Sequence, residues 1–175
     1  MFLDAELHVA YRILNTPILN FPFPHFYVEN VFPHDFYSKI QENLLTEKEM
    51  TSRVIKAIEN PNVTMIGHLT GRLLLSRKPY SINVPKVIDA CASNHTHIEI
   101  NANPRRLDMD WRWWRQAKDK GVKCSINPDA HRIEHFQFLH FGVKIAQKGW
   151  LESNDIINCL PLNEIESTLN KKQNL

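Results

Sequence analysis

The sequence has no long apolar segment, and this lack excludes whole classes of protein. Its purely apolar stretches, such as Leu73–Leu75, fall far short of the roughly 20 residues that span a bilayer. Near the N-terminus, Asp4 and Glu6 occupy positions where a secretory signal would carry Lys or Arg, and no apolar segment follows them. We therefore expect a cytoplasmic protein that does not enter a membrane.

Cysteine pairs and a large net charge are also missing. Cys91, Cys124 and Cys159 are far apart and form no CxxC pair, which argues against both a disulfide framework and a structural zinc site. We expect reduced and mostly buried thiols. A formal net charge of +2 is too small to predict strong nonspecific binding of nucleic acid, so any contact with DNA must be local.

What is present is a globular composition with a change of character near residue 45. Hydrophobic residues make up 43% of the chain and charged residues 23%, which is typical of a folded domain. Four prolines fall in or near an aromatic-rich run at 21–36, namely Pro17, Pro22, Pro24 and Pro33. Because proline cannot donate a strand hydrogen bond, this region predicts short extended pieces and turns, with one strand at His25–Val31 and one helix at Asp35–Leu44.

From Thr46 onward, short β-rich runs alternate with helical patterns. Thr46 and Glu49 form a capping-box pattern that predicts the start of a helix, and Asn60–Pro61 ends it. The β-rich runs lie at Val63–Ile66, His97–Ile100 and Val122–Ile126. Further helical patterns lie at Val84–Ser93, Asp110–Lys120, Glu134–Lys148, Glu152–Leu160 and Leu162–Lys171. This alternation predicts an α/β fold with a parallel sheet or barrel.

Residues that suit metal chemistry follow the first and third predicted strands. The carboxyl ends of parallel strands meet at one rim, where α/β folds build their active sites. His68 follows the first strand, and Asp129 and His131 follow the third. Imidazole and carboxylate groups suit a hard or borderline divalent metal ion. The three side chains are therefore the candidate metal ligands.

Two further rim residues, Arg72 and Asn101, are candidates for substrate contacts. The planar guanidinium of Arg72 suits a substrate phosphate, although an ordinary ion pair is an equal alternative. Asn101 follows the second strand, where Asn101 and Glu99 are also suited to supporting the rim by hydrogen bonds.

Three tryptophans lie close together in a predicted helix, at Trp111, Trp113 and Trp114. They could stack on nucleic-acid bases. At this spacing, however, at least two should pack against the sheet while Arg112 and Arg115 face solvent, and we favour this structural role.

Four motifs, in matching order and spacing, resemble the C-terminal part of the PHP domain of bacterial family X DNA polymerases. They are Ile66–Leu74, Ile98–Pro104, Asp110–Trp114 and Gly121–His131. The resemblance implies an incomplete, distorted (β/α)7 barrel of PHP type over residues 45–175. It also implies that His68, Asp129 and His131 bind Mn or Zn, that Asp129 and His131 are catalytic, and that the activity is phosphoester hydrolysis of the 3′-5′ exonuclease type, with a role in DNA repair.

The resemblance does not extend to the part of the barrel that carries most of the family's ligands. That part opens with a His-x-His strand, and residues 1–44 contain nothing similar. Leu69 also stands where the family usually has Pro. Residues 1–44 instead resemble the opening segment of some 2-oxoglutarate/Fe(II) oxygenases, whose iron ligands are absent from this chain. We therefore expect an N-terminal segment of separate origin over 1–44.

Two functions from different classes follow. The first is a metal-dependent phosphoesterase fragment that acts on DNA or a small phosphate ester through metal-activated water. The second is a catalytically inactive remnant or interaction module, because most of the ligand set is missing. In either case an incomplete barrel leaves strand edges unpaired, so a partner chain or a second copy is expected to complete it.

Overall fold

The structure is a computed structural model that describes residues 5–20, 24–28, 31–33, 36 and 45–170. Contacts within the chain divide it into two units, Met1–Leu45 and Thr46–Leu175. The boundary lies beside Thr46, the residue at which the sequence pattern changes. The separate origin of residues 1–44 stays a prediction, because contacts do not report descent.

The first unit contains one helix that the sequence analysis did not anticipate. Helix α1, Ala5–Leu14, has Glu6 in its first turn and Arg12 in its last, and both charges suit the helix dipole. The strand predicted at His25–Val31 is not formed by the described residues of that range, where His25 makes only an isolated antiparallel bridge to Leu19. The helix predicted at 35–44 lies outside the described residues apart from position 36.

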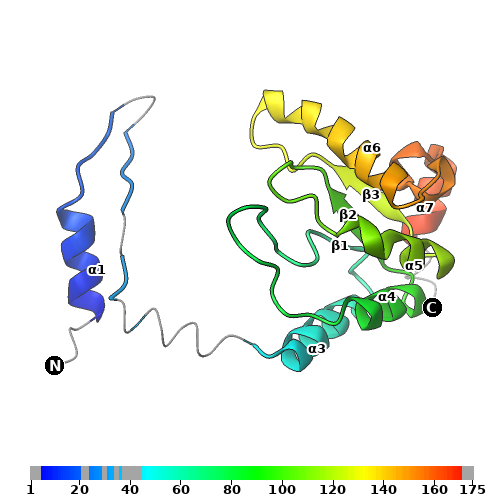
Figure 1. Ribbon diagram of the computed structural model, residues 1–175, viewed down its shortest axis with the longest axis horizontal. Coiled ribbons are helices and arrows are strands. Elements are labelled where there is room, and N and C mark those ends of the chain that lie inside the picture. Colours follow the sequence, from blue (N-terminus) through cyan, green and yellow to red (C-terminus); the bar gives the residue numbers. More distant parts are fainter. Residues whose placement is uncertain (1–4, 21–23, 29–30, 34–35, 37–44, 171–175) are drawn as a thin grey trace. The chain divides into compact units, whose positions relative to one another are not determined.

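The second unit is built on a parallel three-stranded sheet in the order β1-β2-β3. The strands are β1 Met65–Ile66, β2 His97–Asn101 and β3 Cys124–Asn127. All three predicted strands are therefore confirmed. The register pairs Met65 with His97 and Ile98 with Cys124, so the three strands end at the same edge of the sheet (Figure 1).

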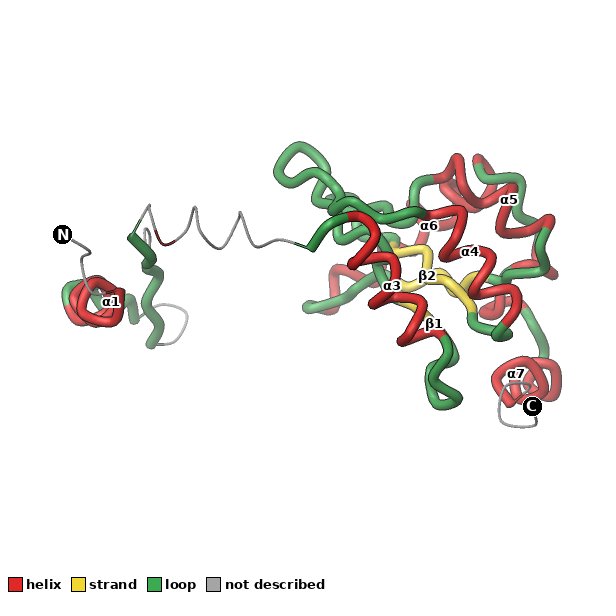
Figure 2. The backbone as a smooth tube through the Cα atoms, turned by 90° about the horizontal axis from the view of Figure 1, so that it is seen from below, coloured by secondary structure: helices red, strands yellow, loops and turns green. Residues whose placement is uncertain are grey.

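Five α-helices of the second unit lie within predicted helical segments. They are α3 Glu47–Ile58, α4 Val84–Ser93, α5 Trp114–Asp119, α6 Leu139–Lys148 and α7 Leu162–Asn170. The capping box at the start of α3 is confirmed, since Thr46 Oγ1 accepts from the Glu49 amide and the Glu49 carboxylate accepts from the Thr46 amide. Helix α3 packs along α4 (Figure 2), and α6 packs on β2 and β3.

The helix predicted at Glu152–Leu160 is wrong. Two short 3₁₀ helices, Ser153–Asp155 and Ile157–Cys159, occupy the segment. They are separated by Ile156, which has extended backbone angles and forms a parallel bridge to Cys124 at the edge of β3. Pairing with the sheet thus prevails over the local helical pattern.

Alternation along the strands gives the sheet two different faces. Ile98, Ile100, Cys124 and Ile126 belong to the hydrophobic core together with helix residues such as fully buried Trp114. The intervening residues Glu99, Asn101, Ser125 and Asn127 are joined by side-chain hydrogen bonds and form the polar face of the sheet. The aliphatic face holds the helices, and the polar face leads to the candidate site.

The expected role of the tryptophans is confirmed. Trp114 is fully buried and Trp113 packs partly buried against the core, while Arg112 and Arg115 are exposed. Trp111 is half-buried, with the Lys148 ammonium 4.5 Å from the centre of its ring. The tryptophan cluster therefore anchors this segment to the core.

The observed fold is a mixed α/β arrangement with a small parallel sheet. Closure into a barrel is not seen in the residues that the structure describes, so the (β/α) barrel stays a prediction. None of the described helices combines the length and apolar character needed to cross a bilayer. Cys91 and Cys124 are buried free thiols and Cys159 is an exposed one, which agrees with the expectation of reduced cysteines.

The close packing of α6 on the sheet yields a test. A Cβ at Gly142 would lie 2.4 Å from Ile126 Cγ2 and 2.8 Å from Ala102 Cβ, closer than side chains approach. We expect Gly142→Val to lower the free energy of unfolding by about 1–3 kcal/mol, because the helix must move away from the sheet. Denaturant unfolding followed by circular dichroism measures this change.

Lys144→Val is the matched control, since Lys144 is exposed on the same helix. It introduces the same side chain and should change stability by about 0.5 kcal/mol or less. Equal losses in the two variants would show that close packing of α6 on the sheet does not limit position 142.

Candidate functional site

The candidate site lies where the three strands end, and the Glu99 carboxylate is its centre. Glu99 Oε2 accepts a hydrogen bond of 2.7 Å from the His68 backbone amide, and Glu99 Oε1 accepts one of 3.0 Å from Asn127 Nδ2. Asn101 Nδ2 lies at 3.5 Å from Oε2. One carboxylate on β2 thus joins the loop after β1 to the end of β3.

Local geometry brings the His68 loop to this carboxylate. A Cβ at Gly67 would lie 3.4 Å from Glu99 Oε2, in van der Waals contact, so the loop backbone passes close to this carboxylate. His68 itself has a positive φ of 29°, which turns the chain sharply after β1. Its side chain is exposed.

Asp129 and His131 lie together in the loop after β3. The backbone of Asp129 is left-handed with φ of 52°, and its carboxylate makes an ion pair of 3.3 Å with Arg106 Nε. His131 Nδ1 lies 2.8 Å from the Asp129 carbonyl oxygen, and its side chain is 74% exposed. The imidazole is thus available to a ligand, whereas the Asp129 carboxylate already has a cationic partner.

The parallel sheet carries all three predicted ligands at the same end, because His68 follows β1 and Asp129 and His131 follow β3. Among the described residues, however, no three His, Cys, Asp or Glu side chains lie close enough together to hold a metal ion. The described ligands therefore do not form a complete metal site in this chain, and the metal-binding role stays a prediction.

Arg72 is engaged within the protein. Its Nη1 pairs with Asp110 Oδ2 at 2.8 Å, its Nε donates to the Arg106 carbonyl at 2.8 Å, and its Nη2 donates to the Leu107 carbonyl. Burial tends to raise the pKa of Asp110, but the hydrogen bonds from Arg112 and Arg72 outweigh it and hold that pKa far below its usual range. The structure thus contains the ion pair that was the alternative to phosphate binding.

Asn101 supports the rim. Only 1% of its surface is exposed, its Oδ1 accepts from the Asn103 amide at 3.1 Å, and its backbone amide donates to the Asp108 carbonyl at 2.6 Å. These contacts are the rim-supporting bonds expected as the alternative. A substrate contact by Asn101 stays a prediction.

Asp108 is a rim residue that the sequence analysis missed. It is fully buried, and its carboxylate accepts from the Thr70 amide at 3.0 Å and from the Thr70 hydroxyl at 2.9 Å. Burial raises its pKa, and the Thr70 bonds only partly offset that rise. A single Asp in an irregular segment gives no sequence signal of burial, because only the fold brings Thr70 to it.

The raised pKa of Asp108 makes stability depend on pH. The folded protein holds the Asp108 proton more tightly than the unfolded chain does. The protonated carboxyl therefore stabilises the fold below pH 3.8, and this contribution is lost as pH rises through the folded pKa. Asp108→Asn keeps an oxygen acceptor without the charge. We expect its free energy of unfolding to fall less than that of the wild type between pH 4 and pH 7.

Urea unfolding at a series of pH values measures this difference. Asp119→Asn, at an exposed position, is the control and should parallel the wild type. If the stability of Asp108→Asn changes with pH as that of the wild type does, Asp108 is not the source of the pH dependence.

Glu99 can be tested in the same way. Glu99→Ala leaves the His68 amide and the Asn127 amide group without their acceptor, which should cost about 1–3 kcal/mol of stability. Glu164→Ala removes an exposed carboxylate from α7 and should change stability by about 0.5 kcal/mol or less. If both variants unfold at the same denaturant concentration, Glu99 does not hold the rim together.

Comparison with known proteins gives a family relationship. No family model matches the chain. The chain is 36% identical over 125 residues to the DNA polymerase/3′-5′ exonuclease PolX of Bacillus subtilis (strain 168). The aligned stretch covers 71% of this chain but only 22% of PolX, so the chain spans about a fifth of that protein's length. The predicted relationship is confirmed: over most of its length the chain is a relative of PolX, a family X DNA polymerase.

Proposed function

We propose that the second unit supplies part of a metal-dependent phosphoesterase site that hydrolyses phosphate esters, including those at DNA 3′ ends. The observation that carries the proposal is the Glu99 bridge, which ties the His68 loop to Asn127, two residues before Asp129. The name of the PolX relative, a 3′-5′ exonuclease, supports the choice of reaction.

The candidate residues have distinct tasks in this proposal. His131, which is largely exposed, can offer an imidazole nitrogen without any rearrangement. Asp129 pairs with Arg106 through Oδ2, so it can offer Oδ1 to a metal ion, and opening of the ion pair would free the guanidinium to bind a phosphoryl oxygen. A bound Mn or Zn ion would supply Lewis-acid chemistry and a more acidic water.

The ligands that this chain lacks would come from a partner chain or from a second copy. The polar face of the sheet supports the partial barrel, because Glu99, Ser125 and Asn127 point away from the helices, as residues inside a barrel do. A chain that added strands beside β1 would cover this face and bring further side chains to the rim.

A non-catalytic interaction module is the second candidate function. It is favoured by the Asp129–Arg106 ion pair and by the lack of a three-ligand group in the described part of the chain. In this case the family sequence maintains the fold, and the loops at the strand ends serve only to bind a partner.

Metal content and hydrolysis distinguish the two candidates. We expect freshly purified protein, supplemented with manganese, to bind metal and to cleave bis(p-nitrophenyl) phosphate and a 5′-labelled oligonucleotide. His131→Ala and Asp129→Asn should each lower both metal content and cleavage at least about tenfold, because each removes a ligand.

His140→Ala is the control, since His140 is an exposed histidine outside the predicted ligand set. It should retain the wild-type values. The assays are run with added manganese, both on dilute protein and at concentrations where the protein self-associates. If the protein binds no metal and cleaves neither substrate under either condition, the phosphoesterase proposal is rejected in favour of the second candidate.

A further inference from the structure

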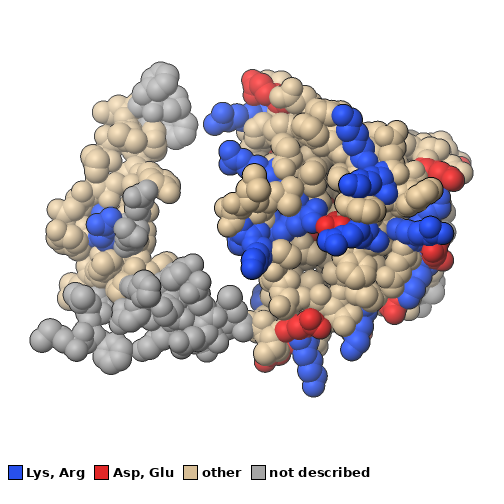
Figure 3. Space-filling view, viewed as in Figure 1, with Lys and Arg blue, Asp and Glu red and all other residues tan. Residues whose placement is uncertain are grey.

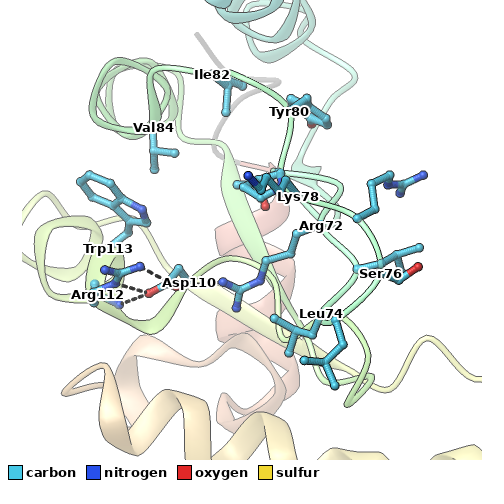
Figure 4. Close-up of a pocket in the computed structure, with 15 residues that line it drawn as sticks. Arg72, Leu74, Ser76, Lys78, Tyr80, Ile82, Val84, Asp110, Arg112 and Trp113 are labelled. Atoms are coloured by element: carbon cyan, nitrogen blue, oxygen red, sulfur yellow. Dashed lines mark hydrogen bonds and ion pairs between the residues drawn. The ribbon is translucent and has the colours of Figure 1, made fainter. Parts of the chain in front are cut away.

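A pocket of about 600 Å³ lies next to the candidate site and contains none of the predicted metal ligands. One wall is the loop from Arg72 to Tyr80, and the other is the segment with Asp110, Arg112 and Trp113 (Figure 4). This volume is within the range of pockets that enclose small ligands. Of its lining residues, the sequence analysis proposed a ligand contact for Arg72 alone.

Positive charge dominates the pocket. Four cations line it, Arg72, Arg77, Lys78 and Arg112, against a single acid, Asp110. Arg72 and Arg112 both pair with Asp110, whereas Arg77 and Lys78 have no carboxylate partner within the part of the chain that the structure describes. Arg77 Nε and Nη2 donate to the Gly71 carbonyl at 3.2 and 2.6 Å, which orients the guanidinium and leaves its charge without a counterion among the described residues. Lys and Arg side chains are prominent on the visible face of the second unit (Figure 3). The pocket is therefore suited to an anion.

Most of the remaining lining residues are apolar, and they include an indole. Trp113, Ile82 and Val84 form this part, across from Lys78 in Figure 4. A bare phosphate would leave these groups in water. A ligand that joins an anionic group to a flat, partly apolar ring system would contact both kinds of lining.

Leu75 gives an independent reason to expect a ligand. It is fully exposed and has a left-handed φ of 63°, which is unfavourable for a leucine. The conformation is held by two hydrogen bonds between Leu73 and Arg77, of 2.7 and 2.9 Å. The turn thus holds an apolar side chain at the mouth of a cationic pocket, where it gains nothing from the protein core.

We propose that this pocket binds a nucleotide unit, with the phosphate on Arg77 and Lys78 and the base against Leu75 and Trp113. The unit is either a free mononucleotide or one residue of a single strand. The inference goes beyond the proposed hydrolysis, because binding here requires neither a metal ion nor His68, Asp129 or His131.

Binding to the full chain in EDTA tests the proposal, since a metal-free measurement is independent of hydrolysis. Calorimetry measures the binding of thymidine monophosphate, thymidine and inorganic phosphate. Fluorescence anisotropy measures the binding of a labelled oligothymidylate. The double variant Arg77→Ala/Lys78→Ala should bind the nucleotide at least about tenfold more weakly. For the strand, the slope of log affinity against log salt should become shallower by about 0.7 for each lost phosphate contact.

Leu75→Asn removes the apolar side chain but tolerates the left-handed backbone, so it should weaken nucleotide binding without changing phosphate binding. Lys56→Ala/Lys144→Ala, which removes the same charge from exposed helix positions, is the control and should match the wild type. Binding of the monophosphate indicates a free nucleotide as the ligand, and binding of the oligonucleotide alone indicates a strand.

Three results would overturn the proposal. The first is that neither the monophosphate nor the oligonucleotide binds. The second is that the pocket variants bind as the control does. The third is that phosphate alone binds as tightly as the nucleotide.

Discussion

The rim of this protein depends on one carboxylate in the middle of a small sheet. Glu99 links the loop after β1 to the side chain of Asn127 on β3, and both of its oxygens accept hydrogen bonds. A parallel sheet brings strand ends to one edge, but it does not fix how the loops beyond them are oriented. The hydrogen bonds of Glu99 supply that orientation on the polar face of the sheet.

A second layer of buried polar contacts supports the rim from the side of the long loop. Asp108 holds Thr70 from within the core, and Asp110 holds Arg72 and Arg112 nearer the surface. The two carboxyls are only two residues apart but respond oppositely to their surroundings. Burial raises the pKa of Asp108, whereas at Asp110 the combined hydrogen bonds from Arg112 and Arg72 outweigh burial and lower the pKa. Thr70, Arg72, Asp110 and Arg112 also line the cationic pocket, so these contacts connect the rim to it.

The relationship to PolX concerns about a fifth of that protein, so it identifies ancestry more firmly than activity. The three predicted metal ligands follow β1 and β3 at the same end of the sheet, but Asp129 is paired with Arg106 and the described ligands do not gather into a group of three. The proposed partner chain or second copy would both pair with the sheet and supply the missing ligands.

The sequence by itself determined the three strands, the capped start of α3, the packing of the tryptophans and the family relationship. These features depend on short-range periodicity, on local capping bonds or on motifs in a fixed order. It could not reveal α1, the extended backbone at Ile156 or the burial of Asp108. Only the tertiary structure decided that Arg72 pairs with Asp110 and that Arg77 and Lys78 face a pocket with Trp113. Such contacts join residues more than thirty positions apart, and no local pattern encodes which partners the fold will bring together.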